Sequence, residues 1–208
     1  MFAIVDSRHC EERGTVMSRW RYALFETPIG ACGIVWEASR LIGIVLPERD
    51  PEATRGRLLR RYADAVEAPP PESIQALIDQ IACLLSGEPV DLSTVELDLS
   101  ETPDFHRRVY GIARNIPPGG TRTYGDIARE LGDVSLSRAV GQALGQNPWP
   151  IVVPCHRVLA ASGRTGGFSA PGGVDTKLRI LSIEARHAPG PPGLFDDLPL
   201  AARPRRPG

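Results

Sequence analysis

The chain has 208 residues, of which 42% are hydrophobic, and its formal net charge is −1 at pH 7. This length is sufficient for one domain or two small ones with a sizeable buried core. No apolar run approaches the roughly 18 residues of a membrane span, and the N-terminus lacks the apolar core of a signal peptide. The sequence therefore argues against a membrane protein and predicts an intracellular, reducing location.

Charge is distributed unevenly along the chain. Residues 1–100 have a net charge of −6, whereas residues 101–187 have a net charge of +4. A positive sign is expected of a module that binds phosphate groups, although many domains without such ligands carry a similar charge. The four cysteines, at positions 10, 32, 83 and 155, form no C-x-x-C pair and have no metal-ligand spacing.

The first half of the chain reads as a scaffold of strands and helices. Residues 1–17 are polar and irregular and are predicted to be a disordered leader. Apolar and β-branched runs separated by turn residues then predict strands, and apolar residues at helical spacing predict helices. The expected strands are 19–26, 30–37 and 41–47, with a further short one at 95–99, and the expected helices are 51–66 and 73–85.

The second half is mostly helical in its pattern. A helix is expected over 103–116, with Thr102 as its N-cap, and a last helix over 174–186 after a glycine-rich loop at 163–173. Between them, two short helices surround a glycine-containing turn, which is the spacing of a helix-turn-helix but also occurs in unrelated folds. These two helices are expected at 124–131 and 135–144, and the Pro/Arg-rich tail at 188–208 is expected to be disordered.

The segment from Pro150 to Val158 combines an apolar run with a cysteine and a histidine. Three β-branched residues precede Pro154, which predicts a stiff, buried strand that ends at Cys155. A lone cysteine is more often an inert core residue than a nucleophile. The adjacent His156 and the glycine-rich segment that follows favour a nucleophilic thiol instead.

Pro154-Cys155-His156-Arg157-Val158 resembles the acceptor-cysteine signature of the O6-alkylguanine-DNA alkyltransferases. The resemblance extends in order from residue 105 to residue 184, which makes it specific. Its other parts are Ile116-Pro117-Pro118-Gly119-Gly120, Thr123-Tyr124-Gly125-Asp126-Ile127-Ala128, Arg138-Ala139-Val140-Gly141, Asn147-Pro148 and the run from Lys177 to Glu184.

This resemblance implies an α+β protein in two parts. A small RNase H-like domain of strands and helices would occupy residues 18–100. A mostly helical domain with the helix-turn-helix and the alkyl acceptor would occupy residues 101–187. The resemblance further implies a cytoplasmic, monomeric protein, located at the nucleoid in a prokaryote, that binds double-stranded DNA in the minor groove.

The implied activity is direct DNA repair, in which the alkyl group of O6-alkylguanine, and also of O4-alkylthymine, moves irreversibly to Cys155. In this pattern a water links Cys155 to His156, and Glu184 orients the imidazole. Tyr124 would donate a hydrogen bond to the departing guanine. No cofactor and no metal are implied, and Cys10, Cys32 and His106 do not form a persuasive metal set.

Further residues take DNA-binding or pocket roles through the same resemblance. Arg138 would replace the extruded base, and Ala139 and Gly141 would keep its helix slim. The remaining roles fall to the hinge Asn147, the carbonyls of Val158 and Cys155, and the amide of Ser169. The chain departs from the common pattern at Phe168, where many relatives have tyrosine, at Leu144, and in a longer loop before Lys177, so the range of alkyl groups stays open.

Two other functions are compatible with parts of the sequence. A non-repairing lesion-binding protein of the alkyltransferase-like kind would use the same helix pair, but such proteins lack the acceptor cysteine. A cysteine hydrolase would use Cys155, His156 and Glu184, but no oxyanion-hole motif is evident and such an enzyme has no need of Arg138.

Overall fold

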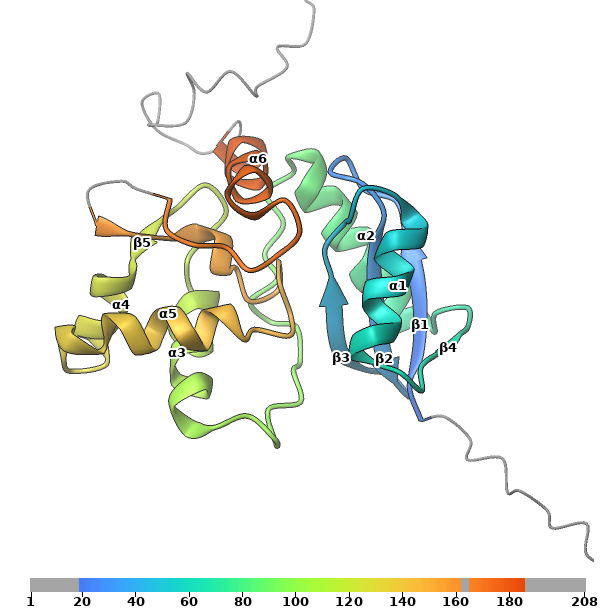
Figure 1. Ribbon diagram of the computed structural model, residues 1–208, viewed down its shortest axis with the longest axis horizontal. Helices are drawn as coiled ribbons and strands as arrows, with labels where there is room; N and C mark the ends of the chain where they lie inside the picture. Colours follow the sequence, from blue (N-terminus) through green and yellow to red (C-terminus); the bar gives the residue numbers. More distant parts are fainter. Residues whose placement is uncertain (1–18, 162–164, 186–208) are drawn as a thin grey trace, which may run out of the picture.

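The computed structural model describes residues 19–161 and 165–185. The predicted leader and the predicted tail both lie wholly outside these residues. The described chain forms a four-stranded sheet with two helices, followed by a set of helices packed beside it (Figure 1). This α+β architecture is the fold class predicted from the sequence. Among the described residues, no helix is long and apolar enough to cross a membrane.

The sheet is built from the strands expected near the N-terminus. β1 (Arg21–Phe25), β2 (Cys32–Glu37) and β3 (Arg40–Val45) form an antiparallel meander. A short fourth strand, β4 (Val66–Glu67), pairs in parallel with β1, so the order is β3-β2-β1-β4. The helix predicted over 51–66 is therefore too long, because the observed helix ends at Arg61 and Val66 belongs to β4.

Both faces of the sheet are covered, which explains why β2 is apolar almost throughout. Alternate side chains point to opposite faces. One face packs on α1 (Pro51–Arg61) through Leu58 and Tyr62. The other packs on α2 (Glu72–Ser86), whose apolar stripe includes Ile81 and Leu85. Asp50 caps α1 by accepting a hydrogen bond from the Ala53 amide at 2.7 Å.

In the second half of the chain, the described residues form helices α3 to α6 and include the short 3₁₀ turns η1 and η2. The expected helix-turn-helix spacing is present between α4 (Tyr124–Glu130) and α5 (Ser137–Gly145). In the turn that joins them, Gly132 lies in the left-handed region (φ 105°) and Asp133 accepts from the Ser135 amide at 2.8 Å. The elements are α3 (Asp104–Arg114), α4 (Tyr124–Glu130), η1 (Val134–Leu136), α5 (Ser137–Gly145), η2 (Cys155–Arg157) and α6 (Gly173–Ala185).

Two local predictions for residues 95–103 are wrong, and one feature of the second half was not predicted. Thr102 does not cap α3, because Pro103 is the N-cap and no side chain completes it. The strand expected at 95–99 is reduced to a single bridge between Leu41 and Leu97. Sequence patterns also missed a parallel pair formed by β5 (Arg122–Thr123) and β6 (Val158–Leu159), which are too short to show periodicity.

The two halves share one hydrophobic core. Side chains of the sheet and of α2 belong to the same buried cluster as those of α3, α5 and α6. The edge strand β3 also reaches across, since the amide of Ile44 donates to the carbonyl of Pro148 at 2.9 Å. Pro148 lies shortly before the cysteine segment, so the sheet helps to position that segment. The boundary proposed near residue 100 remains a prediction.

Candidate active site and DNA-binding surface

Cys155 is positioned by a turn and not by the predicted strand. Ile151 has φ 76°, a conformation that β-branched residues rarely adopt, and Cys155 opens the 3₁₀ turn η2. The Asn147 side chain stabilises this path. Its amide donates to the Val153 carbonyl at 2.8 Å, and its oxygen accepts from the Trp149 amide at 2.9 Å. Asn147 therefore acts as a tie between α5 and the cysteine segment.

The thiol of Cys155 is half-buried at the wall of a pocket. Burial raises its pKa above the ordinary value, and the neighbouring Asn147 amide and Lys177 ammonium act in the opposite direction. The resting group is therefore a thiol at neutral pH. A base must accept its proton before the sulfur becomes a strong nucleophile.

Behind the thiol lies a fully buried polar network around Glu184. His156 Nε2 lies 3.0 Å from Glu184 Oε1, as the resemblance implied. Arg157 adds two hydrogen bonds to the same carboxylate, at 2.9 and 2.8 Å, and a third to the Ile116 carbonyl at 2.6 Å. Burial opposes ionisation of Glu184, but His156 and Arg157 outweigh it and lower its pKa to about 2.

This network determines the form of His156. Its pKa is lowered because burial disfavours the charged ring, an effect that the Glu184 carboxylate only partly offsets. A neutral ring that faces an ionised carboxylate through Nε2 has its proton there, which leaves Nδ1 as an acceptor. Nδ1 is buried and has no hydrogen-bond partner among the described residues. His156 can therefore accept a proton on the side away from Glu184.

A buried lysine, not predicted as a site residue, lies beside the thiol. Lys177 Nζ donates to the Val158 carbonyl at 2.6 Å and lies about 6 Å from the ring centres of Tyr124 and Phe168 (5.9 and 6.0 Å). Burial lowers its pKa to about 8, although Cys155 acts in the opposite direction. Lys177 thus places positive charge near the sulfur and holds two aromatic rings of the pocket wall.

A pocket of about 570 Å³ opens beside Cys155 toward the helix pair. It brings together most of the pocket and DNA-contacting residues predicted from the sequence. Ser169 also donates to the Gly145 carbonyl at 3.0 Å, which fixes the loop against the end of α5. The lining residues are Tyr124, Ser137, Arg138, Gly141, Leu144, Gly145, Cys155, Gly167, Phe168 and Ser169.

Tyr124 is held in this pocket from two sides. It is the first residue of α4, directly after Thr123, whose hydroxyl forms a capping box with Asp126. Gly166 presents its backbone to the ring, where a Cβ atom would lie 3.0 Å from Tyr124 Cε2. The pKa of Tyr124 is raised by burial and by Cys155, so the hydroxyl keeps its proton and remains a donor.

The second helix of the pair presents its N-terminal end to solvent. Arg138 is exposed and makes no salt bridge with the described residues. Ala139 is half-buried, and a Cβ atom on Gly141 would lie 3.8 Å from the Tyr124 ring, which is ordinary contact. Small residues therefore leave room beside Tyr124, while Arg138 extends from the rim.

The two carbonyls expected to read guanine already accept hydrogen bonds. That of Cys155 accepts from the Val158 amide, and that of Val158 accepts from Lys177. Each oxygen has a second lone pair, so both are still able to accept from a ligand. Arg157 and Lys177 are the polar residues that sequence reasoning left without a role. Arg157 lies two residues after the cysteine, and the spacing of Lys177 with the apolar residues Ile180 and Leu181 on one helix face was the available signal for the lysine.

A helix pair beside a pocket with a cysteine at its wall is the arrangement of a DNA-binding protein with a nucleophilic thiol. Comparison with known proteins agrees. Residues 104–186 match the family model of the 6-O-methylguanine DNA methyltransferase DNA-binding domain. The methylated-DNA–protein-cysteine methyltransferase of Mycolicibacterium paratuberculosis is 38% identical over 156 residues, which are 74% of this chain and 92% of that protein. The chain therefore belongs to the O6-alkylguanine-DNA alkyltransferase family.

Solved structures extend the similarity to most of the chain. Mycobacterium tuberculosis OGT in complex with DNA matches with a TM-score of 0.63 and 35% identity, over 81% of this chain and 95% of that one. The O6-methylguanine-DNA methyltransferase of the archaeon Pyrococcus kodakaraensis matches with a TM-score of 0.60 and 29% identity, over 79% and 98%. Both halves of the fold are thus included in the comparison.

Proposed function

We propose that this protein repairs DNA directly by moving the alkyl group from O6 of guanine to the sulfur of Cys155. The observation that carries the proposal is the joint position of Cys155, Tyr124 and Arg138 on one pocket, with the His156–Glu184 pair buried behind the thiol. Family membership supports the same reaction. No cofactor is required, because the damaged DNA supplies the alkyl group.

The reacting carbon is hidden in duplex DNA until the nucleotide leaves the stack, which costs a few kcal/mol. The proposal gives this step to the helix pair. Arg138 enters the minor groove from the start of α5 and occupies the space that the base vacates. An arginine suits this role, because its planar group both stacks on neighbouring bases and donates hydrogen bonds.

The buried pair of His156 and Glu184 then assists the transfer of the alkyl group. The Cys155 proton passes through a water molecule to Nδ1 of His156, whose charged form is stabilised by the ionised Glu184. The sulfur forms a bond to the alkyl carbon, and the bond from that carbon to O6 breaks with its electron pair on guanine. Tyr124 donates a hydrogen bond to the departing base. Overall, one proton moves from sulfur to guanine.

The product is a thioether at Cys155, which the residues of the site offer no means to reverse. Each molecule therefore acts only once. The proposed active form is a monomer. O4-alkylthymine is proposed as a second substrate, because its alkyl group is held by the same type of bond to oxygen. A thiol that must stay reduced, and a substrate that is chromosomal DNA, support a cytoplasmic location, at the nucleoid in a prokaryote.

Intact-mass analysis tests this proposal. The protein is incubated with an excess of duplex oligonucleotide that carries one O6-methylguanine. We expect each protein molecule to gain one methyl group and then stop, with an equal amount of guanine restored. Cys155→Ser should gain none. Repeated release of product without any gain in protein mass would contradict the proposal and support a hydrolase.

A further inference from the structure

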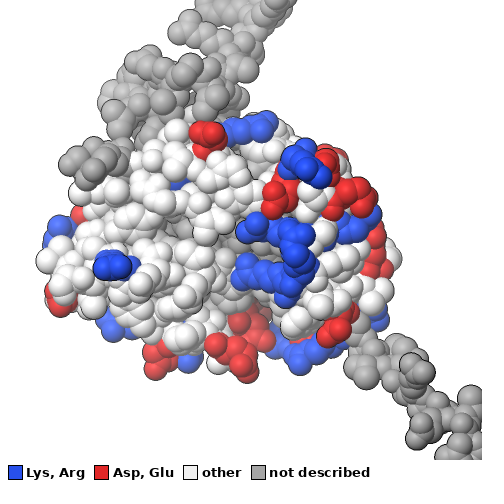
Figure 2. Space-filling model, viewed as in Figure 1, with Lys and Arg blue, Asp and Glu red and all other residues white. Residues whose placement is uncertain are grey.

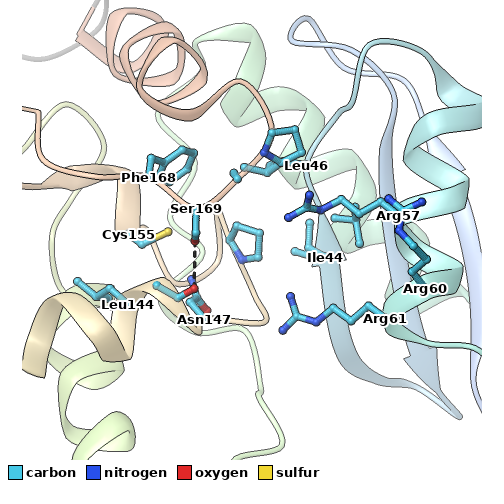
Figure 3. Close-up of a pocket in the computed structure, with 15 residues that line it drawn as sticks. Ile44, Leu46, Arg57, Arg60, Arg61, Leu144, Asn147, Cys155, Phe168 and Ser169 are labelled. Atoms are coloured by element: carbon cyan, nitrogen blue, oxygen red, sulfur yellow. Dashed lines mark hydrogen bonds between the residues drawn. The ribbon is translucent and has the colours of Figure 1, made fainter.

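Cys155 also lines a second cavity, whose lining does not include Arg138. This cavity has a volume of about 340 Å³ and lies between the two halves of the molecule. Arg57, Arg60 and Arg61 line it from the sheet domain, opposite Cys155 (Figure 3). The wall that it shares with the first pocket consists of Leu144, Gly145, Cys155, Phe168 and Ser169.

The three arginines come from one face of α1, because residues three and four apart on a helix are neighbours. In Figure 3 the side chains of Arg57 and Arg61 extend from α1 toward the cavity, whereas that of Arg60 lies back along the helix, where its Nη1 atom would be 3.6 Å from a Cβ atom on Gly56. Figure 2 shows a group of positive side chains near the centre of the face in view. No Asp or Glu residue is among the described residues that line the cavity. The lining of the cavity therefore has positive side chains on one wall and no acidic side chain among its described residues.

The arginines differ in how far they are already paired. Arg57 forms a salt bridge with Glu48 at 3.2 Å. Among the described residues, neither Arg60 nor Arg61 forms a salt bridge, and the Arg61 guanidinium lies 5.6 Å from the ring centre of Tyr62. Both side chains are exposed, so they can move toward a ligand at low cost. At least two guanidinium groups are thus free of a carboxylate partner in this part of the structure.

We propose that this cavity receives the far end of the O6 substituent and that Arg57, Arg60 and Arg61 favour substituents that end in an anionic group. The inference rests on the proposed function. With guanine in the first pocket, the reacting carbon must meet the sulfur at the shared wall. Atoms beyond that carbon then extend past Cys155 into the second cavity. A carboxylate there pairs with the planar fork of an arginine.

The reaction balances without a further reagent. For an O6-carboxymethyl group, the bond from sulfur to the methylene carbon forms and the bond from that carbon to O6 breaks. The electron pair of the broken bond stays on guanine, which gains the proton that the thiol loses. The carboxylate remains ionised throughout and ends on Cys155 as a carboxymethyl thioether.

Anionic groups have a second source in this system, since the DNA backbone is a row of phosphates. The two sources predict different dependence on the substituent. Arginines that bind backbone phosphate would act equally on every lesion and on undamaged duplex. Arginines that bind the substituent would act only where the substituent is charged.

The experiment compares single-turnover rates for three duplexes that differ only at O6 of one guanine. The substituents are methyl, carboxymethyl, and carbamoylmethyl, which matches carboxymethyl in size but has no charge. Rates are measured by the mass gain of the full-length protein. The variants are the triple Arg57→Gln, Arg60→Gln, Arg61→Gln and the corresponding triple lysine variant. A triple control, Arg40→Gln, Arg49→Gln, Arg55→Gln, removes the same charge outside the cavity.

We expect the carboxymethyl group to react about tenfold faster than the carbamoylmethyl group, as a charge-assisted hydrogen bond would allow. The triple glutamine variant should lose this preference but keep the methyl rate, whereas the lysine variant should keep most of the preference. Thermal unfolding of each variant confirms that it is folded. The control triple should behave as the unaltered protein.

Three results would overturn the inference. Equal rates for the charged and neutral substituents would show that the cavity is not charge-selective. An equal loss on all three lesions in the glutamine variant, with weaker binding of undamaged duplex, would assign the arginines to backbone phosphates. Failure of the unaltered protein to accept even a methyl group would instead remove the proposed function on which the inference rests.

Discussion

Arg157 donates one hydrogen bond to each oxygen of the Glu184 carboxylate, at 2.9 and 2.8 Å, and the two side chains are almost completely buried. The same carboxylate lies 3.0 Å from His156. Arg157 therefore holds the group that orients the base, although it faces neither the pocket nor the thiol. A buried pair of this kind contributes to function through position and through charge balance.

Removal of Arg157 from this buried ion pair should reduce the stability of the protein. We expect Arg157→Gln to lower the free energy of unfolding by about 3 kcal/mol, because Glu184 would be left buried with less compensation. Arg129→Gln provides the control, since its 2.9 Å pair with Asp126 is exposed and contributes less than about 1 kcal/mol. Urea titration of both variants measures the difference. Equal midpoints would show that the buried pair is not important for stability.

Stability should fall as the pH is lowered, for two reasons with the same sign. The folded-state pKa of Glu184 is about 2 against an ordinary 4.5, so its contribution is complete above pH 4.5 and is lost as pH falls toward 2. The pKa of His156 lies below its ordinary 6.5, so the folded state resists protonation and stability begins to fall below that pH. Urea unfolding between about pH 7 and pH 3 measures this. Glu184→Gln should show a flatter profile, and an identical one would contradict the assignment.

The Tyr124 hydroxyl should matter for rate and not for stability. We expect Tyr124→Phe to slow methyl transfer about a hundredfold, because the departing guanine loses a hydrogen-bond donor. Tyr110→Phe is the matched control, since that hydroxyl donates to the Ala143 carbonyl at 2.9 Å and does not line the pocket. Single-turnover rates at saturating DNA separate the two. Similar rates for both variants would remove Tyr124 from the chemical step.

Arg138 should be required for duplex DNA and not for the transfer itself. Arg138→Ala should react at least about tenfold more slowly with O6-methylguanine in a duplex, because extrusion of the base costs a few kcal/mol that Arg138 offsets. The free nucleobase O6-methylguanine needs no extrusion, so the variant should react with it at the unaltered rate. Arg129→Ala, an exposed arginine on α4, serves as control. An equal loss on both substrates would place Arg138 in the chemistry.

Much of the fold follows from local patterns in the sequence. The three strands of the meander and the helices α2 to α6 were predicted, because alternation and helical spacing are strong where one face is buried. The segment at Ile151 was predicted wrongly as a strand. Its apolar residues are buried, but Asn147 supplies the hydrogen bond to Val153 that a neighbouring strand would have supplied. Periodicity does not distinguish these cases.

The site was predicted from residue types and their order, and its contacts required the fold. The bond between His156 and Glu184 joins residues 28 positions apart, and no local pattern reveals it. The helix over 51–66 was predicted, but its arginines were given no role. Their place opposite Cys155 depends on how the sheet docks, through contacts such as that of Ile44 with Pro148, against the second half of the chain.

Peptide mapping after reaction tests the central claim most directly. The protein is treated with duplex DNA containing O6-methylguanine, digested, and examined by tandem mass spectrometry at each of its four cysteines. The account predicts one methyl group, on the peptide containing Cys155, and none at Cys32, whose burial raises its pKa to about 12, or at the exposed Cys83. A methyl group on another cysteine, or repaired DNA with Cys155 unmodified, would contradict it.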